Sequence, residues 1–346
     1  MDLRPQQVEG PNAVSDSPIL VINDVSKTFR IRSGFFGGNL SLTAVKSASL
    51  TVWAGEIVAV IGESGCGKST LGRLITTEIS PNGGTVEFSG TDAGEFALRE
   101  RAKFVQPVPQ DPKGALDPRW KIGRILSEPI RIHGLVPEAR IGEMVDDMLD
   151  QVGLKSNMAE KFPRDLSGGE AQRVVIARAI ALSPKVLVCD EAVSALDAAV
   201  QVDIIKLLLS VRDSTRTALV FISHDLAMVN RISDRVMIMY LGEILEIVPA
   251  SRLGHEAGHP YSSALIKAAP RFGRAPDAGP RATLKGEVPS PIDRPGGCVF
   301  HPRCPIADSV CRTTEPRFVT VSEGHLVKCH FAEAARGDDD NTLVSS

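Results

Sequence analysis

GESGCGKST, residues 62–70, fits the pattern G-x-x-x-x-G-K-S at every fixed position and decides how this chain folds. The apolar run EIVAVIG (residues 56–62) predicts a buried strand before it, and STLGRLIT (residues 69–76) predicts a helix after it. Strand, glycine-rich loop and helix in this order form a phosphate-binding loop, because glycine lets backbone N–H groups turn toward an anion. A chance glycine-rich turn is the alternative, and the flanking strand and helix disfavour it.

The other residues of the loop suit a nucleotide bound with Mg²⁺. Lys68 is expected to reach the β- and γ-phosphates, and Ser69 offers a hydroxyl to Mg²⁺. Thr70 lies at the start of the helix, where the helix dipole favours an anion. Cys66 is interpreted as a small spacer and not as a nucleophile. The predicted nucleotide-binding residues of the loop are Gly62, Glu63, Ser64, Gly65, Cys66, Gly67, Lys68, Ser69 and Thr70.

Length and composition set the limits for this prediction. The chain has 346 residues, enough for one large domain and a small one, and its 43% hydrophobic content can form a core. A net charge of -3 does not suggest whole-chain affinity for nucleic acid or an anionic membrane. No apolar run approaches the roughly 18 residues of a membrane-spanning helix, and the polar N-terminus is not a signal peptide. These features predict a cytosolic protein whose six cysteines are free or bind metal.

Alternating strand-like and helix-like segments predict an α/β fold from residue 19 to about 250. One helix is predicted from an apolar face that Gly153 closes: Ile141, Met144, Val145, Met148, Leu149 and Val152. Proline, glycine and arginine accumulate from residue 250 to 297, which predicts a linker. The predicted organisation is a flexible tail (1–18), a nucleotide-binding domain (19–250) with a helical subdomain (about 111–175), an extension that carries four cysteines (251–335) and a second tail (336–346).

Two further motifs lie in the predicted nucleotide-binding domain. LVCDE places Asp190 and Glu191 at the end of an apolar strand, where neighbouring side chains face different ways. Asp190 is therefore the predicted Mg²⁺ residue and Glu191 the candidate general base. LSGGEAQR places Ser167, Gly168 and Gly169 at the start of a helix, a second possible anion site. The alternative there is an ordinary capping box of Ser167 with Glu170.

GESGCGKST, LSGGEAQR, LVCDEAVSALD and FISHDL, in this order, resemble an ATP-binding-cassette ATPase. The resemblance implies a P-loop, RecA-like core with an antiparallel β subdomain and a helical subdomain. It also implies a head-to-tail dimer in which ATP lies between the Lys68 loop of one subunit and the Ser167–Gly169 signature of the other. Gln110 is similar to the glutamine-loop residue that contacts Mg²⁺, and His224 to the switch histidine. Asp197 is similar to the residue that crosses the dimer interface, and Phe29 to the aromatic residue that stacks on adenine, with a plain core role as its alternative.

Two departures from the family pattern stand out. Glu170 replaces the commoner glutamine of the signature, and we expect this to be tolerated because Ser167 and the glycine amides make the main contacts. Pro107 and Pro109 precede Gln110, where the family usually has apolar residues. Since proline removes ladder donors, this strand is predicted to be short or at a sheet edge.

QDPKGALDPR, HPYSSAL and GCVFHPRCPIADSVC are similar to oligopeptide and dipeptide importers, and the stretch after Phe29 resembles the second of their two ATPase subunits. This implies a second, different ATPase chain, two permeases, a solute-binding protein and a peripheral position on the cytoplasmic face of the inner membrane. Relatives of this type also carry nickel, sugars or opine-like compounds. A soluble ATPase acting on nucleic acid or ribosomes is the alternative, although the basic or coiled-coil insertions it would need are not seen.

Four cysteines, Cys298, Cys304, Cys311 and Cys329, lie in the predicted extension with the spacing C-x5-C-x6-C-x17-C. This spacing matches neither zinc-finger pairs nor the ferredoxin pattern. A metal staple, structural thiols or a disulfide all stay possible, and a segment poor in apolar residues favours the staple. The family resemblance implies an iron–sulphur cluster of the [4Fe–4S] type. Zinc is the alternative, with His301, His325 and His330 nearby, and each of these histidines is more simply an exposed polar residue.

Overall fold

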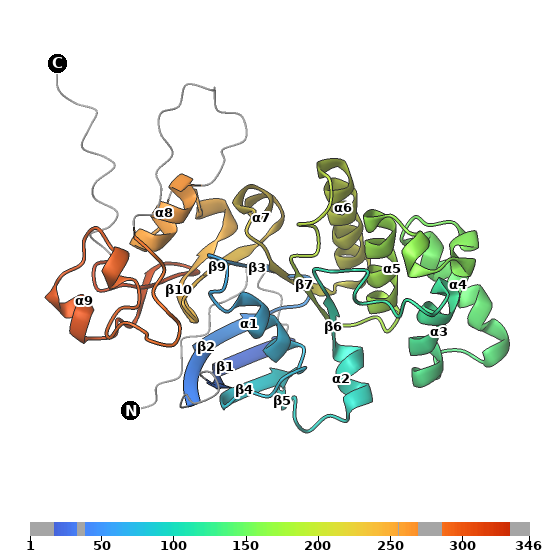
Figure 1. The fold of residues 1–346 in the computed structure, drawn as a ribbon, viewed down its shortest axis with the longest axis horizontal. Coiled ribbons are helices and arrows are strands. Elements are labelled where there is room, and N and C mark those ends of the chain that lie inside the picture. The colour runs from blue at the N-terminus through green and yellow to red at the C-terminus, as the bar shows by residue number, and fades with distance from the viewer. Residues whose placement is uncertain (1–16, 33–38, 255, 269–285, 333–346) are drawn as a thin grey trace, which may run out of the picture.

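The structure, a computed structural model, describes residues 17–32, 39–254, 256–268 and 286–332 (Figure 1). The predicted tail at 336–346, and all of the tail at 1–18 except its last two residues, lie outside these ranges. None of the described helices combines the length and apolar character that crossing a bilayer requires.

An eight-stranded mixed sheet forms the centre of the molecule, in the order β11-β12-β10-β9-β3-β8-β7-β6. The strands from β9 to β6 run parallel, and β10, β12 and β11 pair antiparallel. Every residue of β3 and β8 is buried, which suits parallel strands covered on both faces. The strands are β3 (Ile57–Ile61), β6 (Val105–Val108), β7 (Val186–Asp190), β8 (Ala218–Ile222), β9 (Arg235–Tyr240), β10 (Glu243–Pro249), β11 (Phe318–Ser322) and β12 (His325–Lys328).

Strand β6 confirms the expectation drawn from its proline. It is four residues long and lies at one edge of the sheet, where Pro107 pairs with Val188 of β7. An edge strand has one unpaired side, so the missing N–H of proline breaks no ladder there.

A second, antiparallel sheet has the order β2-β1-β4-β5, with β1 (Leu20–Arg32), β2 (Asn39–Val52), β4 (Gly83–Phe88) and β5 (Thr91–Asp92). Helix α1 (Lys68–Ile75) packs between the two sheets, because Leu71 and Leu74 share one buried cluster with Leu20 and Val60. The stacked rings of Phe88 and Phe104 join this sheet to helix α2 (Leu98–Phe104). The predicted α/β core with an antiparallel β subdomain is confirmed.

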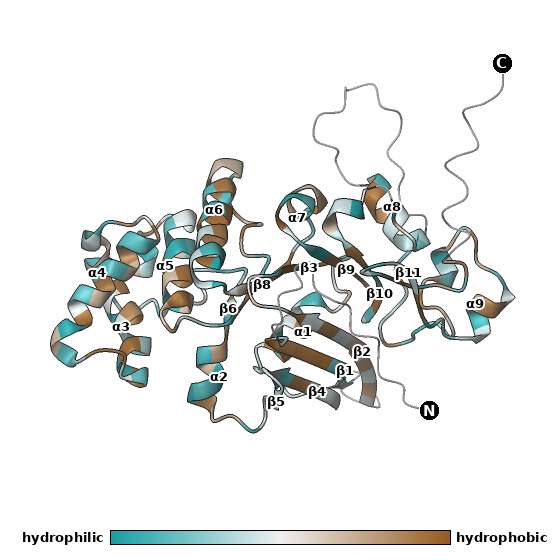
Figure 2. Cartoon of the chain, turned by 180° about the vertical axis from the view of Figure 1, so that it is seen from behind, coloured by the Kyte–Doolittle hydropathy of each residue, from teal (hydrophilic) through white to brown (hydrophobic). Residues whose placement is uncertain are grey.

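Helices gather at the other end of the sheet and form one core with β7 and β8. Helix α4 confirms the predicted apolar face, and Gly153, with φ +71°, donates its N–H to Asp150 as the chain turns away. Figure 2 shows brown and teal residues alternating on α3 and α4, as amphipathic helices require. These helices are α3 (Ile122–His133), α4 (Ile141–Gln151), α5 (Gly168–Ile180) and α6 (Ala198–Thr215), with 3-10 turns η1 (Glu138–Arg140), η2 (Ser156–Glu160) and η3 (Pro163–Asp165). Helix α7 (Leu226–Ile232) lies nearer the middle of the sheet, where Val229 shares a core with β9 and helix α8 (Pro260–Ala268).

The linker predicted at residues 250–297 is wrong in part. The turn η4 (Ala250–Arg252) and helix α8 (Pro260–Ala268) lie within it, while residues 269–285 lie outside the described ranges. Helix α8 is short and lacks a regular apolar period, so the sequence pattern did not predict it. The segment from residue 286 to 332, called here the C-terminal segment, adds η5 (His301–Arg303), α9 (Ser309–Thr313), β11 and β12.

The C-terminal segment shares the core of the main domain. Phe300 is fully buried and packs against Tyr240 of β9 and Tyr261 of α8, with ring centroids 5.4 and 5.3 Å apart. Strand β12 pairs with β10, so the hairpin of β11 and β12 extends the central sheet. The segment therefore buries Val299 and Phe300 in the core of the main domain and has only a small cluster of its own, around Val327 and Cys329.

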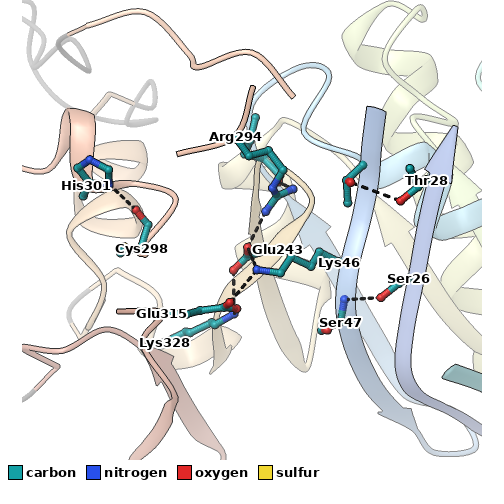
Figure 3. Close-up of polar contacts among 12 residues, drawn as sticks. Ser26, Thr28, Lys46, Ser47, Glu243, Arg294, Cys298, His301, Glu315 and Lys328 are labelled. Carbon is teal, nitrogen blue, oxygen red and sulfur yellow. Dashed lines mark hydrogen bonds and ion pairs between the residues drawn. The ribbon is translucent and has the colours of Figure 1, made fainter. Parts of the chain in front are cut away.

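A charged network also joins the C-terminal segment to both sheets (Figure 3). Glu243, only 2% exposed, contacts Lys46 of β2 at 3.2 Å, Arg294 at 2.5 Å and Lys328 of β12 at 2.7 Å. Glu315 contacts the same two lysines. A buried carboxylate is tolerated only with such compensation, so this network fixes the position of the segment.

Replacing Phe300 with alanine should destabilise the whole domain by about 3–5 kcal/mol, because it empties a shared core. Phe318→Ala is the matched control: Phe318 lies in the same segment but is 41% exposed, so the change should stay within about 0.5 kcal/mol. Urea unfolding monitored by circular dichroism measures both. Two separate transitions, with only the smaller one moved by Phe300→Ala, would contradict a shared core.

Candidate functional site

The loop at residues 62–70 connects β3 to α1 and is pressed against two other strands. A Cβ added to Gly62 would lie 2.0 Å from the carbonyl oxygen of Met239 in β9. A Cβ on Gly67, whose φ is +110°, would lie 2.1 Å from the carbonyl oxygen of Ala44 in β2. Only glycine fits at either position, so the backbone of the loop lies close against the two sheets.

Lys68 is the first residue of helix α1, where the loop meets the helix. Its side chain is buried, and Nζ donates to the carbonyl oxygens of Gly62 at 2.9 Å and Glu63 at 3.0 Å. Carbonyl oxygens hold the ammonium in place without neutralising it, so its charge stays available to an anion. Burial raises the pKa of the Cys66 thiol beside it, which fits a spacer better than a nucleophile.

Ser69 and Asp190 face each other beside the loop. The Ser69 hydroxyl donates to Asp190 Oδ1 at 3.2 Å. Burial raises the pKa of the Asp190 carboxyl, while the Ser69 hydrogen bond and the charge of Lys68 act in the opposite direction. A hydroxyl and a partly desolvated carboxylate are oxygen ligands of the kind Mg²⁺ prefers, so the pair fits the predicted metal position.

Glu191 is held between two polar side chains. Gln110 Nε2 donates to Glu191 Oε2 at 2.9 Å, and His224 Nδ1 lies 3.5 Å from Glu191 Oε1. Glu191 has φ +46°, an unusual backbone value, and its N–H donates to Ile222 at the end of β8. The three side chains follow the carboxyl ends of β6, β7 and β8, which are neighbours in the sheet, where ligands of open parallel sheets bind.

The predicted signature lies in a second group. Ser167 caps α5 and accepts a hydrogen bond from the Glu170 N–H, and the Glu170 carboxylate accepts from the Ser167 N–H at 2.8 Å. These contacts form the capping box and lower the pKa of Glu170. A Cβ on Gly169 would lie 2.6 Å from Val200 of α6, so glycine lets α5 approach the start of α6, which Asp197 caps.

The two groups are not in contact within one chain. Among the residues that the structure describes, no hydrogen bond or ion pair joins the segment 167–169 to the loop 62–70. Helix α5 lies on the helical side of the molecule, and α1 lies beside the antiparallel sheet (Figure 1). One chain thus carries two separate halves of the predicted nucleotide site.

Phe29 lies on β1 opposite Leu42 of β2 and is half-buried. The Nζ of Lys27 lies 5.5 Å from its ring centroid. Ala44, two residues beyond Leu42, contacts the loop at Gly67, so β2 connects the neighbourhood of Phe29 with the loop. Phe29 is therefore not fully enclosed in the core.

The four late cysteines are reduced and largely buried in the C-terminal segment. Burial raises the pKa of Cys298 to about 11 and raises those of Cys304 and Cys329, with smaller contributions from the neighbouring thiols. The Cys298 N–H donates to the Cys311 carbonyl oxygen at 2.8 Å. The thiols are therefore neighbours, but the described residues contain no group of three or more potential ligands arranged to hold a metal ion.

The nearby histidines have other partners, and the expectation of exposed side chains is wrong for His325. His325 is fully buried, with Nε2 2.6 Å from Glu246 Oε1, because β12 pairs with β10. His301 and His330 are half-buried, and their ring nitrogens lie 2.9 Å from the carbonyl oxygens of Cys298 and Thr314.

Sequence reasoning missed two partners of the loop. Arg303 forms a bidentate ion pair with Glu63, and the hydroxyl of Tyr261 accepts the Glu63 N–H. Arg303 is 240 residues from Glu63 in the chain, and no local pattern marks either residue as a partner.

Comparisons with known proteins identify the family of the chain. The model of the ABC transporter family matches residues 45–194, and the model of the oligopeptide/dipeptide transporter C-terminal region matches residues 245–311. A probable peptide ABC transporter ATP-binding protein of Sinorhizobium fredii is 44% identical over 92% of this chain and 91% of its own length. The oligopeptide transport ATP-binding protein AppF of Bacillus subtilis is 39% identical, covering 92% of this chain and 99% of its own.

Two solved structures share the fold. A dimeric ATP-binding cassette in a post-hydrolysis state, bound to ADP and phosphate, has a TM-score of 0.60 at 25% identity and covers 67% of this chain and 98% of its own. CbiO1 of Clostridium perfringens, part of an ABC transporter complex, has a TM-score of 0.58 at 24% identity and covers 68% of this chain and 90% of its own.

The packing of the loop predicts different costs for two of its glycines. Gly67→Ala should lower the free energy of unfolding by about 3 kcal/mol, because it adds both left-handed strain and a clash with Ala44. Gly65→Ala is the control: Gly65 has φ +76° but no atom within 4 Å of its Cβ position, so only about 1 kcal/mol of strain is expected. Denaturant titration compares them, and equal losses would show that the close contact is unimportant.

Proposed function

The chain belongs to the ABC transporter ATP-binding proteins, and from this we propose that it is the ATP-hydrolysing subunit of a bacterial importer for peptides or related small solutes. The observation that carries the proposal is the full-length match to peptide transport ATP-binding proteins, which includes the C-terminal region. The site supports it, because Glu191 lies between Gln110 and His224 beside the Lys68 loop.

ATP and Mg²⁺ would be held by the residues at the start of α1 and the end of β7. The loop amides and Lys68 would bind the phosphates, and Ser69, Asp190 and Gln110 would hold Mg²⁺. Mg²⁺ would supply charge neutralisation on the phosphate oxygens. Two observations support this assignment: the glycine positions at which no Cβ fits, and the Lys68 ammonium, which the carbonyl oxygens of Gly62 and Glu63 hold without a carboxylate partner among the described residues.

Glu191 acts as the general base in the proposed hydrolysis. Its carboxylate orients a water and takes one proton from it as the water oxygen bonds to the γ-phosphorus and the bond to the ADP oxygen breaks. Gln110 and His224 hold the carboxylate in position, and His224, which is 64% exposed, would also contact the γ-phosphate of bound ATP. The hydrogen bond from Gln110 makes the position of Glu191 sensitive to movement of the loop after β6.

We propose that two ATPase chains complete the site. The Ser167–Gly169 segment of one chain would close on ATP in the Lys68 loop of the other, with Asp197 at the seam and Phe29 against adenine. The separation of the two groups supports a site shared between chains, because no hydrogen bond or ion pair among the described residues joins the segment 167–169 to the loop 62–70. The partner is proposed to be a different ATPase chain.

The cycle of closure and reopening would drive two permease subunits on the cytoplasmic face of the inner membrane, where a solute-binding protein delivers the cargo. The soluble alternative acting on nucleic acid or ribosomes has no support, because the relatives are transport ATP-binding proteins. Peptides are the proposed cargo on the same ground.

A separate proposal concerns the four late cysteines, which we infer to hold an iron–sulphur cluster, with zinc as the alternative. Its support is the presence of four thiols in one short segment, where the Cys298 N–H donates to the Cys311 carbonyl oxygen; the four thiols of the described residues are not themselves arranged as a metal-binding group. Thiolates suit either metal, and bound metal would favour the deprotonated form that burial disfavours. The role would be structural or redox-sensing.

The variant Glu191→Gln should bind MgATP with unchanged affinity while the ATPase rate of the assembled transporter falls about 100-fold or more. An amide keeps the shape of the side chain but cannot take the proton. Asp190→Asn is the contrast, since it should weaken Mg²⁺-dependent ATP binding as well as turnover. Phosphate-release assays and calorimetric titration separate the two. Normal hydrolysis by Glu191→Gln would remove this residue from the role of base.

Protein purified anaerobically should contain iron and sulphide and absorb broadly in the visible region, and Cys298→Ser should lose both. Cys189→Ala, which removes a buried thiol from β7, should leave the iron content and absorption unchanged. A colourless protein with zinc would favour the alternative metal. A featureless spectrum without bound metal would refute the cluster.

A further inference from the structure

Glu63 is a negative residue inside the loop proposed to bind phosphates, and the C-terminal segment holds its carboxylate. Arg303 Nη1 donates to Glu63 Oε2 at 2.7 Å, and Nη2 donates to Oε1 at 3.0 Å. The Arg303 side chain is 4% exposed and that of Glu63 is 22% exposed, so water screens the pair only weakly. A bidentate arginine–carboxylate pair fixes direction as well as charge.

The backbone of Glu63 is held as firmly as its side chain. The Glu63 N–H donates to the hydroxyl of Tyr261, a fully buried residue of α8, at 3.0 Å. The Glu63 carbonyl oxygen accepts from Lys68 Nζ at 3.0 Å. The hydroxyl of Tyr240 accepts from Arg303 Nη1 at 3.3 Å, which positions the guanidinium in turn. The contacts therefore run from the C-terminal segment through Glu63 to the ammonium of the loop.

Two physical effects of this arrangement favour phosphate binding. An unpaired carboxylate next to an anion site would repel the phosphates, and the guanidinium neutralises it. A backbone fixed before the ligand arrives also reduces the entropy lost on binding. Both effects act on the affinity for the nucleotide and leave the proton transfer at Glu191 unchanged.

We propose that Arg303 and Tyr261 are positioning residues that hold Glu63, and through it Lys68, in the geometry that receives the phosphates of ATP. The inference rests on the proposed function of the loop. Arg303 directly precedes Cys304 in the chain, so the segment that carries the four cysteines forms a structural part of the ATP site. The affinity of that site for ATP then depends on the integrity of this segment.

Arg303→Met tests the inference in the full-length chain and in the assembled transporter. The Kd of MgATP and the KM for ATP should each rise about tenfold, while kcat at saturating ATP stays within about twofold. Arg303→Lys should recover part of the affinity, since it restores one charged contact. The matched control is Arg252→Met, which removes another arginine contact to the C-terminal segment, at Ser322, far from the loop in sequence and without contact to Glu63.

The double variant Glu63→Gln with Arg303→Met gives the sharpest result. If Arg303 neutralises Glu63, the uncharged side chain of Glu63→Gln should restore most of the ATP affinity that Arg303→Met loses. If Arg303→Met instead lowers affinity through a general loss of stability, Glu63→Gln should not restore it. Wild-type affinity in Arg303→Met, or a double variant no better than Arg303→Met alone, would overturn the inference.

Tyr261→Phe decides the question if Arg303→Met does not fold. It removes the acceptor of the Glu63 N–H and should raise the Kd of MgATP about threefold; an unchanged Kd would overturn the inference.

Lys68→Ala separates this outcome from failure of the proposed function. If Lys68→Ala binds MgATP normally, the loop is not the ATP site. If Lys68→Ala alone loses affinity, the loop binds ATP and only the positioning role is wrong.

Discussion

The close packing of Gly62 and Gly67 against β9 and β2 is the constraint on which the rest of the site depends. At each position a backbone carbonyl oxygen occupies the place that a Cβ would take. These contacts hold the loop against β9 and β2. The Lys68 ammonium folds back onto the loop, where the carbonyl oxygens of Gly62 and Glu63 accept its hydrogen bonds without cancelling its charge. Strand β7 ends beside α1, so Asp190 at the end of β7 accepts a hydrogen bond from Ser69, the residue that follows Lys68.

The C-terminal segment is part of the same construction. It shares aromatic core residues with β9 and α8, extends the central sheet through β12, and surrounds buried Glu243 with cations. Its contact with Glu63 reaches the loop itself. Contacts with the main domain thus hold this proline- and glycine-rich segment in place. They compensate for the small size of its own hydrophobic cluster.

Local signals were sufficient for much of the fold and of the candidate site. Pro107 predicted an edge strand because proline lacks a ladder donor, and the spacing of Ile141, Val145 and Met148 predicted α4 because helical periodicity repeats within a few turns. Gln110, Glu191 and His224 come together because each follows a parallel strand of one sheet. Helix α8 and the burial of His325 were not predicted, since both are set by packing against strands distant in sequence.

The sequence by itself determined the glycine-rich loop, the order of strands and helices around it, and the placement of Asp190 and Glu191 at the end of a strand. These depend on backbone conformation and on short-range periodicity, which neighbouring residues encode. Only the tertiary structure decided that Arg303 and Tyr261 bind Glu63, that Glu246 contacts His325, and that the two groups of the proposed nucleotide site lie apart in one chain. Such contacts join residues far apart in sequence, and their partners are chosen by the three-dimensional packing of the sheets.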